Sequence, residues 1–256
     1  MPAVELTVKA ILFDSDGTLI DSTPAVKRTI ARWCAVQQVD PREFAAAQHG
    51  TRAKDLLRRF ATTPKKGSEM SEEELDAAVE ELEKSVGETA RQMKAHGEGS
   101  GIVALPGVLE LLAKLQGGGA QWGIVTSATR IHAVPALEIA GILAPPVMVT
   151  GEQVSAGKPS PEPYLIGIDR LRDLQPDLMP LDVLVVEDAP AGFESAYSAG
   201  ARLLAVCTEP VEAAEVQEAA SKVNGAVVVK DLTAVSVLQC SSESITLRVE
   251  LADIVV

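Results

Sequence analysis

Short apolar runs alternate with helical patterns along most of this chain. The runs VKAILF, QWGIVT, DVLVV, RLLAV and GAVVV are each long enough for one strand, and amphipathic segments separate them. Continuous hydrophobicity, rather than alternation, is typical of strands buried on both faces of a parallel sheet. The pattern therefore predicts an α/β fold with a Rossmann-like parallel-sheet core, in which the helices are crossover connections.

One segment between two predicted strands is too long for this alternation of strands and helices. Roughly 100 residues separate the first strand from the strand ending at Thr126, whereas a βαβ unit needs about 30. The interval shows helical periodicity, including a capping box from Ser71 to Glu74 ahead of a long acidic helix. We therefore expect an inserted all-helical cap domain over residues 23–99, with the core formed by residues 1–22 and 100–256.

The last segment, SITLRVELADIVV, alternates between apolar and polar residues as a half-buried strand does. It could extend the edge of the main sheet or form a hairpin. We assign it no chemistry.

Composition narrows the range of partners. The chain has 256 residues and a formal net charge of −13, so nucleic acid and anionic membrane surfaces are unfavourable partners. Its three cysteines form no C-x-x-C pair, which suits a reducing compartment. Neither a signal-peptide pattern nor a membrane-spanning run is visible. We expect a cytoplasmic protein, and nothing in the sequence requires more than a monomer.

Polar side chains lie at the carboxyl ends of several predicted core strands or in the loops that follow them. These residues are Asp14, Asp16, Thr126, Lys158, Glu187 and Asp188. Ligands of open parallel sheets bind at this edge, so distant positions in the chain can converge there. The sequence predicts one site built from all of them.

These residue types suit cleavage of a phosphate monoester. Asp14 can attack phosphorus as a nucleophile, and Asp16 can protonate the leaving oxygen and later accept a proton from water. Thr126 and Lys158 can stabilise the phosphoryl oxygens. Two acids two residues apart thus have different roles.

The same chemistry requires a cation to neutralise the phosphate. Mg²⁺ prefers carboxylate and carbonyl oxygens. The expected ligands are Asp14, the main-chain carbonyl of Asp16, and Asp188, with Glu187 binding directly or through water. Mg²⁺ is therefore the predicted cofactor.

Four stretches, DSDGT, VTSATR, GKPSPEPY and VEDAPAG, follow one another between residues 14 and 192. In this order they resemble the haloacid dehalogenase superfamily, in its phosphatase and phosphomutase branch with a helical cap. The resemblance implies that Asp14 is the nucleophile and Asp16 the acid/base. It also implies phosphate binding by Thr126 and Lys158, and metal binding by Glu187 and Asp188. Ser127, next to Thr126, is a further candidate substrate-binding residue.

A closer similarity joins QHGTRAKDLL, GKPSPEPYL and the alternating tail to the fungal-type glycerol-1-phosphatase and 2-deoxyglucose-6-phosphatase group. It implies a small phosphorylated sugar or polyol as substrate. His49 and Arg52 lie between two predicted cap helices and are candidate substrate-binding residues. For Arg52 the alternative is an i, i+3 pair with Asp55 on a solvated helix face. Both readings of Arg52 stay open.

Other functions fit less well. Related phosphomutases carry a histidine where Val26 falls here, and a dehalogenase has no need of Asp16 as an acid. A phospho-receiver signalling module needs about half this length and places its acid pair on the first strand. A binding protein without activity would be expected to lack one of the core residues. We expect the two tryptophans, Trp33 and Trp122, to pack in the interior, and assign His96 and His132 no role.

Overall fold

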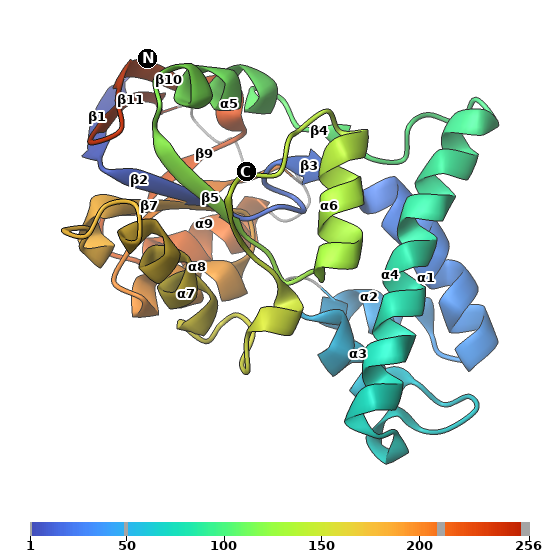
Figure 1. Cartoon of the computed structure of the whole chain (residues 1–256). Coiled ribbons are helices and arrows are strands. Elements are labelled where there is room, and N and C mark those ends of the chain that lie inside the picture. Colours follow the sequence, from blue (N-terminus) through green and yellow to red (C-terminus); the bar gives the residue numbers. More distant parts are fainter. Residues whose placement is uncertain (1, 49–50, 209–212, 252–256) are drawn as a thin grey trace.

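The computed structural model describes residues 2–48, 51–208 and 213–251. Six parallel strands form the central sheet in the order β6-β5-β2-β7-β8-β9. Figure 1 shows β2 next to β5 and β7 in this sheet. The strands are β2 (Ala10–Phe13), β5 (Gln121–Val125), β6 (Val147–Val149), β7 (Val183–Glu187), β8 (Arg202–Val206) and β9 (Val227–Val229). The predicted α/β, Rossmann-like core is confirmed.

Helices cover both faces of this sheet, because alternate residues of each strand point to opposite sides. Ile11 and Phe13 of β2 belong to the apolar cluster that includes α5 and α6, whereas Leu12 belongs to the cluster that includes α7, α8 and α9. The helices are α5 (Val108–Gly117), α6 (Arg130–Ile139), α7 (Glu162–Arg172), α8 (Pro190–Ser198) and α9 (Ala213–Ser221). Burial on both sides explains the uninterrupted apolar runs.

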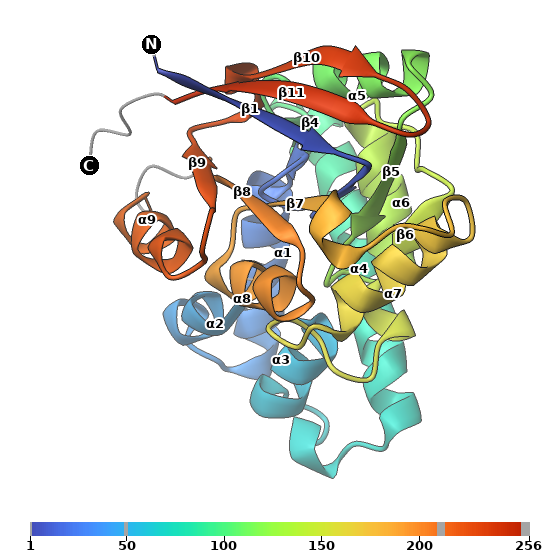
Figure 2. The ribbon, with the colours of Figure 1, turned by 90° about the vertical axis from the view of Figure 1, so that its left-hand side faces the viewer.

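A second, antiparallel sheet has the order β1-β11-β10. It contains β1 (Ala3–Val8), β10 (Val235–Cys240) and β11 (Ile245–Glu250), and Figure 2 shows β1 lying beside β11. The alternating tail thus forms a hairpin with β10 rather than extending the main sheet. Residues 252–256 of this tail lie outside the described residues.

The run VKAILF is divided between two sheets, which the sequence pattern did not predict. Val8 ends β1 and Ala10 begins β2. The Lys9 amide donates to the main-chain carbonyl of Asp182 at 2.8 Å, and the Lys9 ammonium donates to the Asp182 carboxylate at 2.9 Å. These contacts hold the bend between the two strands.

A helical insert lies between β3 (Ile20–Asp21) and β4 (Val103–Ala104), which pair antiparallel. Figure 1 shows it beside the sheet. It contains α1 (Thr23–Gln37), α2 (Pro41–Gln48), α3 (Ala53–Phe60) and α4 (Glu72–Ala95). The capping box predicted at Ser71 and Glu74 is present.

The insert has apolar clusters of its own, one around Leu57 and Leu75 and another around Cys34 and Phe44. Trp33 packs on Phe44 with their ring centroids 5.1 Å apart. The last turns of α4 join the core of the sheet instead. The insert is therefore packed internally at its outer end and against the core at its base.

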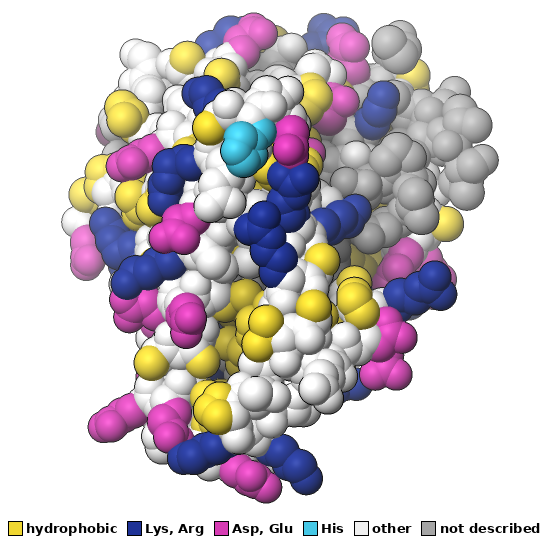
Figure 3. Space-filling model, turned by 90° about the vertical axis from the view of Figure 1, so that its right-hand side faces the viewer, with side chains coloured by type: hydrophobic (Ala, Val, Ile, Leu, Met, Phe, Trp, Pro, Cys, Tyr) yellow, Lys and Arg dark blue, Asp and Glu magenta, His cyan; other side chains and the backbone are white. Residues whose placement is uncertain are grey.

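Short 3-10 turns complete the described structure: Gly67–Glu69, Gly151–Gln153, Pro180–Asp182 and Leu232–Ala234. In the part of the chain that the structure describes, no helix has the length and apolar character needed to cross a membrane. The face shown in Figure 3 carries acidic and basic side chains close together. The ion pair of Arg28 and Glu98 is one example of such mixing on the insert.

We expect Gly123→Ala to destabilise the fold. A Cβ at this position in β5 would lie 2.7 Å from the carbonyl oxygen of Val147 on the neighbouring strand. Overpacking of this kind lowers the free energy of unfolding by about 1–3 kcal/mol. Urea unfolding monitored by circular dichroism measures the change.

The matched control is Gly87→Ala in the interior of α4, where the nearest atom to an added Cβ is an Arg91 side-chain nitrogen at 3.8 Å. Alanine favours a helix over glycine by about 1 kcal/mol, so this variant should be more stable than the parent. Equal unfolding midpoints for the two variants would contradict the account of strand packing.

Candidate active site

Three carboxylates meet at the carboxyl edge of the central sheet. Asp14 follows β2 and Glu187 ends β7, and these strands are parallel neighbours with Phe13 opposite Val186. Oxygen atoms of Asp14, Glu187 and Asp188 lie within 4.8 Å of one another, and all three residues are buried. The predicted convergence of two distant motifs is therefore present in the structure.

A buried ammonium holds two of these acids. Lys158 Nζ donates to Asp14 Oδ1 at 2.5 Å, to Glu187 Oε1 at 2.6 Å and to the carbonyl of Val125 at 3.0 Å. Burial alone would lower the pKa of Lys158, but the two carboxylates outweigh it and raise this pKa. Burial also raises the pKa of Asp14 well above its ordinary value, although Lys158 opposes that shift.

Glu187 is fixed through both oxygens. Its Oε1 accepts from Tyr164 Oη at 3.1 Å in addition to Lys158, and its Oε2 accepts the amides of Asp188 and Ala189, each at 2.9 Å. A Cβ on Gly192 would lie 1.9 Å from Glu187 Oε1, so only glycine leaves room for this carboxylate. This geometry suits a residue that orients Lys158, and leaves Asp14 and Asp188 as the better candidates for direct metal ligands.

The turn after β2 wraps around Asp188. Thr18 Oγ1 donates to Asp188 Oδ1 at 2.9 Å. Gly17 has a φ of +93°, and an added Cβ would lie 2.0 Å from Asp188 Oδ2. The Gly-Thr pair of DSDGT is thus explained by close approach to the third acid.

Asp16 has a different environment from the other acids. Its Oδ1 accepts from Ser22 Oγ at 2.5 Å and lies 3.2 Å from His132 Nε2, and its side chain is 30% exposed. Burial tends to raise its pKa, but His132 and Ser22 outweigh this and lower it. The two acids of DSDGT therefore have different hydrogen-bond partners, Lys158 for Asp14 and Ser22 with His132 for Asp16.

His132 is a contact that the sequence did not reveal. We assigned it no role, because a lone histidine on a predicted helix carries no spacing signal. The structure buries it in α6 against Asp16. In the same region, Glu83 of α4 accepts from the amide of Thr129 at 3.1 Å.

Thr126 and Ser127 follow β5, which is parallel to β2 with Ile124 opposite Phe13. The Thr126 side chain is buried, and its Oγ1 accepts from the amide of Ala128 at 3.1 Å. The hydroxyl can still donate its own hydrogen to a ligand. Both residues therefore lie at the edge that carries Asp14.

Arg52 contacts both the insert and the core. It donates to Asp55 from Nε at 2.8 Å and from Nη2 at 3.2 Å, and its Nη1 reaches the carbonyl of Val154 at 3.0 Å. Its side chain also covers Gly157, next to Lys158. The Asp55 pair is thus present together with a contact to the loop before Lys158. His49 lies outside the described residues.

The acid cluster fits a hard divalent cation. Its donors are all oxygens, which Mg²⁺ prefers. Three carboxylates and one ammonium leave an excess of two negative charges in a buried place, and a divalent ion would balance them. The residues present therefore fit the predicted cofactor.

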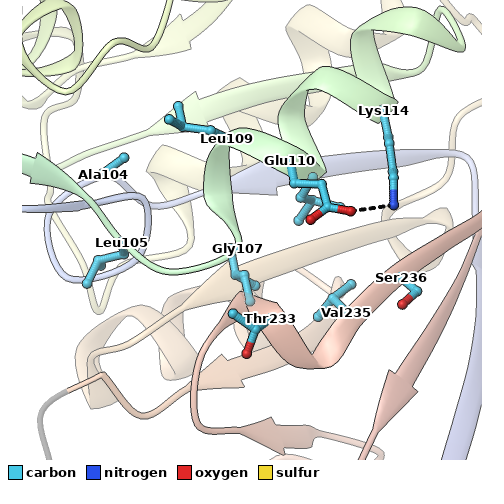
Figure 4. Close-up of a pocket in the computed structure, with 11 residues that line it drawn as sticks. Ala104, Leu105, Gly107, Leu109, Glu110, Lys114, Thr233, Val235 and Ser236 are labelled. Carbon is cyan, nitrogen blue, oxygen red and sulfur yellow. Dashed lines mark hydrogen bonds and ion pairs between the residues drawn. The ribbon is translucent and has the colours of Figure 1, made fainter.

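A separate hollow of about 320 Å³ lies between α5 and the segment leading into β10. Figure 4 shows Glu110 and Lys114 paired at its side, at 2.8 Å, with Gly107 and Thr233 nearby. It belongs to elements other than those that carry the acids.

Sequence comparison finds related proteins across most of the chain. The family model described as haloacid dehalogenase-like hydrolase matches residues 11–206. Hexitol phosphatase A of Escherichia coli (strain K12) is 40% identical over 198 residues, covering 77% of this chain and 82% of the relative.

Two proteins of Saccharomyces cerevisiae are also similar. Glycerol-1-phosphate phosphohydrolase 2 is 32% identical over 211 residues, which cover 80% of this chain and 77% of the relative. 2-deoxyglucose-6-phosphate phosphatase 1 is 31% identical over 257 residues, which cover 96% of both chains.

Solved structures share the fold. A HAD hydrolase of family IA, variant 3, from Entamoeba histolytica superimposes with a TM-score of 0.69 at 22% identity, covering 89% of this chain and 95% of that one. A proposed beta-phosphoglucomutase from Bacteroides vulgatus gives a TM-score of 0.63 at 26% identity, covering 88% and 84%.

We expect Lys158→Met to destabilise the protein strongly. The change leaves Asp14 and Glu187 buried without their shared ammonium, and loss of one partner of a buried ion pair costs about 3–5 kcal/mol. Urea unfolding in the presence of a chelator measures the effect. Adding Asp14→Asn to this variant removes one of the uncompensated charges and should restore part of the loss. A Lys158→Met protein as stable as the parent would contradict this account of the cluster.

Proposed function

Because the chain belongs to the haloacid dehalogenase-like hydrolase family, we propose that this phosphatase is Mg²⁺-dependent and hydrolyses the phosphate monoester of a small sugar or polyol. Family membership confirms the resemblance carried by its four motifs. The observation that carries the proposal is the buried cluster of Asp14, Glu187 and Asp188, in which Lys158 binds the first two, while Asp16 binds Ser22 and His132.

The names of the relatives support the substrate class. They are named hexitol phosphatase, glycerol-1-phosphate phosphohydrolase and 2-deoxyglucose-6-phosphate phosphatase. Each name refers to the removal of phosphate from a small polyhydroxylated compound. We propose the same class here, without choosing one ester within it.

In the proposed mechanism, an Asp14 oxygen attacks phosphorus and the bond to the alcohol oxygen breaks, giving an aspartyl-phosphate. Asp16 donates a proton to the leaving alkoxide. Water then attacks the aspartyl-phosphate while Asp16 accepts its proton, and phosphate leaves. Thr126 and Ser127 donate hydrogen bonds to the phosphoryl oxygens, and Lys158 holds Asp14 in position. When bound, Mg²⁺ would neutralise negative charge on the phosphate and the cluster.

We propose that residues 23–99 act as a cap on the core formed by residues 1–22 and 100–256. The short ladder of β3 with β4 connects the two parts. Gly97, Gly99 and Gly101 all have positive φ near this connection, which suits a hinge. A cap of this kind would exclude water during the first step and open to release the alcohol.

Hydrolysis is favoured over a phosphomutase reaction because Val26 occupies the place where related mutases carry a histidine. Val26 is partly buried against the core cluster, and its hydrocarbon side chain has no group that can transfer a proton. A cytoplasmic location and a monomeric state stay predictions.

The first experiment is a panel of esters assayed for phosphate release with Mg²⁺ and with chelator. The panel contains glycerol-1-phosphate, glycerol-3-phosphate, 2-deoxyglucose-6-phosphate, hexitol phosphates, hexose phosphates and phosphoglycolate. We expect release that requires Mg²⁺ and is highest with one sugar or polyol ester. Interconversion of a hexose phosphate without phosphate release would instead establish a mutase.

We expect Asp14→Asn to lower kcat by at least about 10³-fold, because an amide oxygen cannot act as the nucleophile. The variant should unfold at a temperature no lower than the parent, since it removes one charge from a buried acidic cluster. Phosphate release and thermal unfolding together separate the two effects. Activity close to that of the parent would refute the mechanism.

A further inference from the structure

His132 lies at the acid/base candidate rather than in an apolar environment. It is 7% exposed, and its Nε2 lies 3.2 Å from Asp16 Oδ1. The same oxygen accepts a hydrogen bond from the hydroxyl of Ser22, the residue before α1. Asp16 is thus held from two directions, by the start of the helical insert and by α6.

A second contact fixes the helix that carries His132. Thr129 is the N-cap residue of α6, yet its side chain makes no cap hydrogen bond within that helix. Both its hydroxyl and its amide donate to Glu83 of α4 instead. A carboxylate at a helix N-terminus is favourable, because the free amides and the helix dipole stabilise negative charge there.

Glu83 is 7% exposed, and burial raises its pKa. A buried carboxylate costs free energy unless it is hydrogen-bonded, and the hydroxyl and the amide of Thr129 supply those hydrogen bonds here. Figure 1 shows α4 and α6 side by side, with α6 nearer the sheet. Glu83 of α4 therefore contacts Thr129 of α6, and His132 of the same helix α6 contacts Asp16.

We propose that His132 is a positioning residue for the Asp16 carboxylate, and that Glu83 makes this positioning depend on the docking of α4 against α6. The proposal rests on the proposed function, because it gives Asp16 the role of acid/base. His132 fixes the orientation of the carboxylate toward the leaving oxygen. Without it, Ser22 holds one oxygen alone and the carboxylate can turn about that contact.

A merely structural His132 would have a different signature. Its loss would lower stability and leave the reaction of the folded fraction unchanged for every substrate. Loss of a positioning contact acts on both proton transfers of Asp16. Of these, kcat/KM reports the first, in which Asp16 donates a proton to the leaving oxygen. That step matters for an alkyl leaving group, and matters little for an aryl phosphate whose phenolate leaves without a proton.

The experiment compares His132→Leu with His132→Gln, using the best alkyl ester of the panel and p-nitrophenyl phosphate. Leucine removes the nitrogen, whereas glutamine keeps an N–H donor at a similar reach. We expect His132→Leu to lower kcat/KM for the alkyl ester by about 10–100-fold and to change that for the aryl ester by less than about threefold. His132→Gln should recover most of the loss. His96→Leu, in an exposed residue at the end of α4, is the control and should match the parent.

The role of Glu83 is tested by a double-mutant cycle. Glu83→Ala should reduce kcat/KM for the alkyl ester in the same leaving-group-dependent way, and combining it with His132→Leu should add little, because both changes disturb one chain of contacts. Equal losses for both esters, no loss in a folded His132→Leu protein, or fully additive effects would each overturn the proposal.

Crystal structures of the parent and of His132→Leu give a readout that does not depend on activity. We expect the Asp16 carboxylate to turn about its retained Ser22 contact in the variant, and an unchanged Asp16 orientation would overturn the proposal. A parent protein that cleaves none of the esters would refute the proposed function instead, and these structures would then decide whether His132 positions Asp16.

Discussion

The buried ammonium of Lys158 is the interaction on which the site depends. It lies between Asp14 and Glu187 and also binds the last carbonyl of β5, so it connects three neighbouring strands of the sheet at one point. Like charges so close together repel strongly where the dielectric constant is low. The positive charge of Lys158 offsets this repulsion and allows Asp14 and Glu187 to stay buried. The negative charge that remains makes the cluster suited to a metal ion. The cluster suits an anionic substrate only when that ion is present.

The central sheet and the acid cluster could be predicted from the sequence because their signals are local. Each strand buried on two faces is a short apolar run, and each acid follows directly after such a run. Parallel pairing then brings the ends together without further information. The same reasoning failed at Lys9, where a continuous apolar run is divided between two sheets. That division depends on contacts with Asp182, which is distant in sequence.

The contacts of His132, Glu83 and Arg52 could not be derived in the same way. Glu83 is one of many acids in α4, and only its position opposite the start of α6 distinguishes it from its solvated neighbours. Arg52 has the i, i+3 partner that spacing allows, but its contact with Val154 requires knowing how the insert docks. Periodicity reports which face of a helix is buried. It does not report which residue of another element lies opposite.

The hydrogen bond from Thr18 to Asp188 joins residues 170 positions apart. Closing so long a loop costs conformational entropy that only the assembled sheet can offset. A nascent or partly folded chain therefore holds its acids far apart and solvated, as ordinary surface carboxylates. The ability to act on a phosphate ester would therefore arise together with completion of the fold, and partly folded forms that expose apolar strands would be chemically inert.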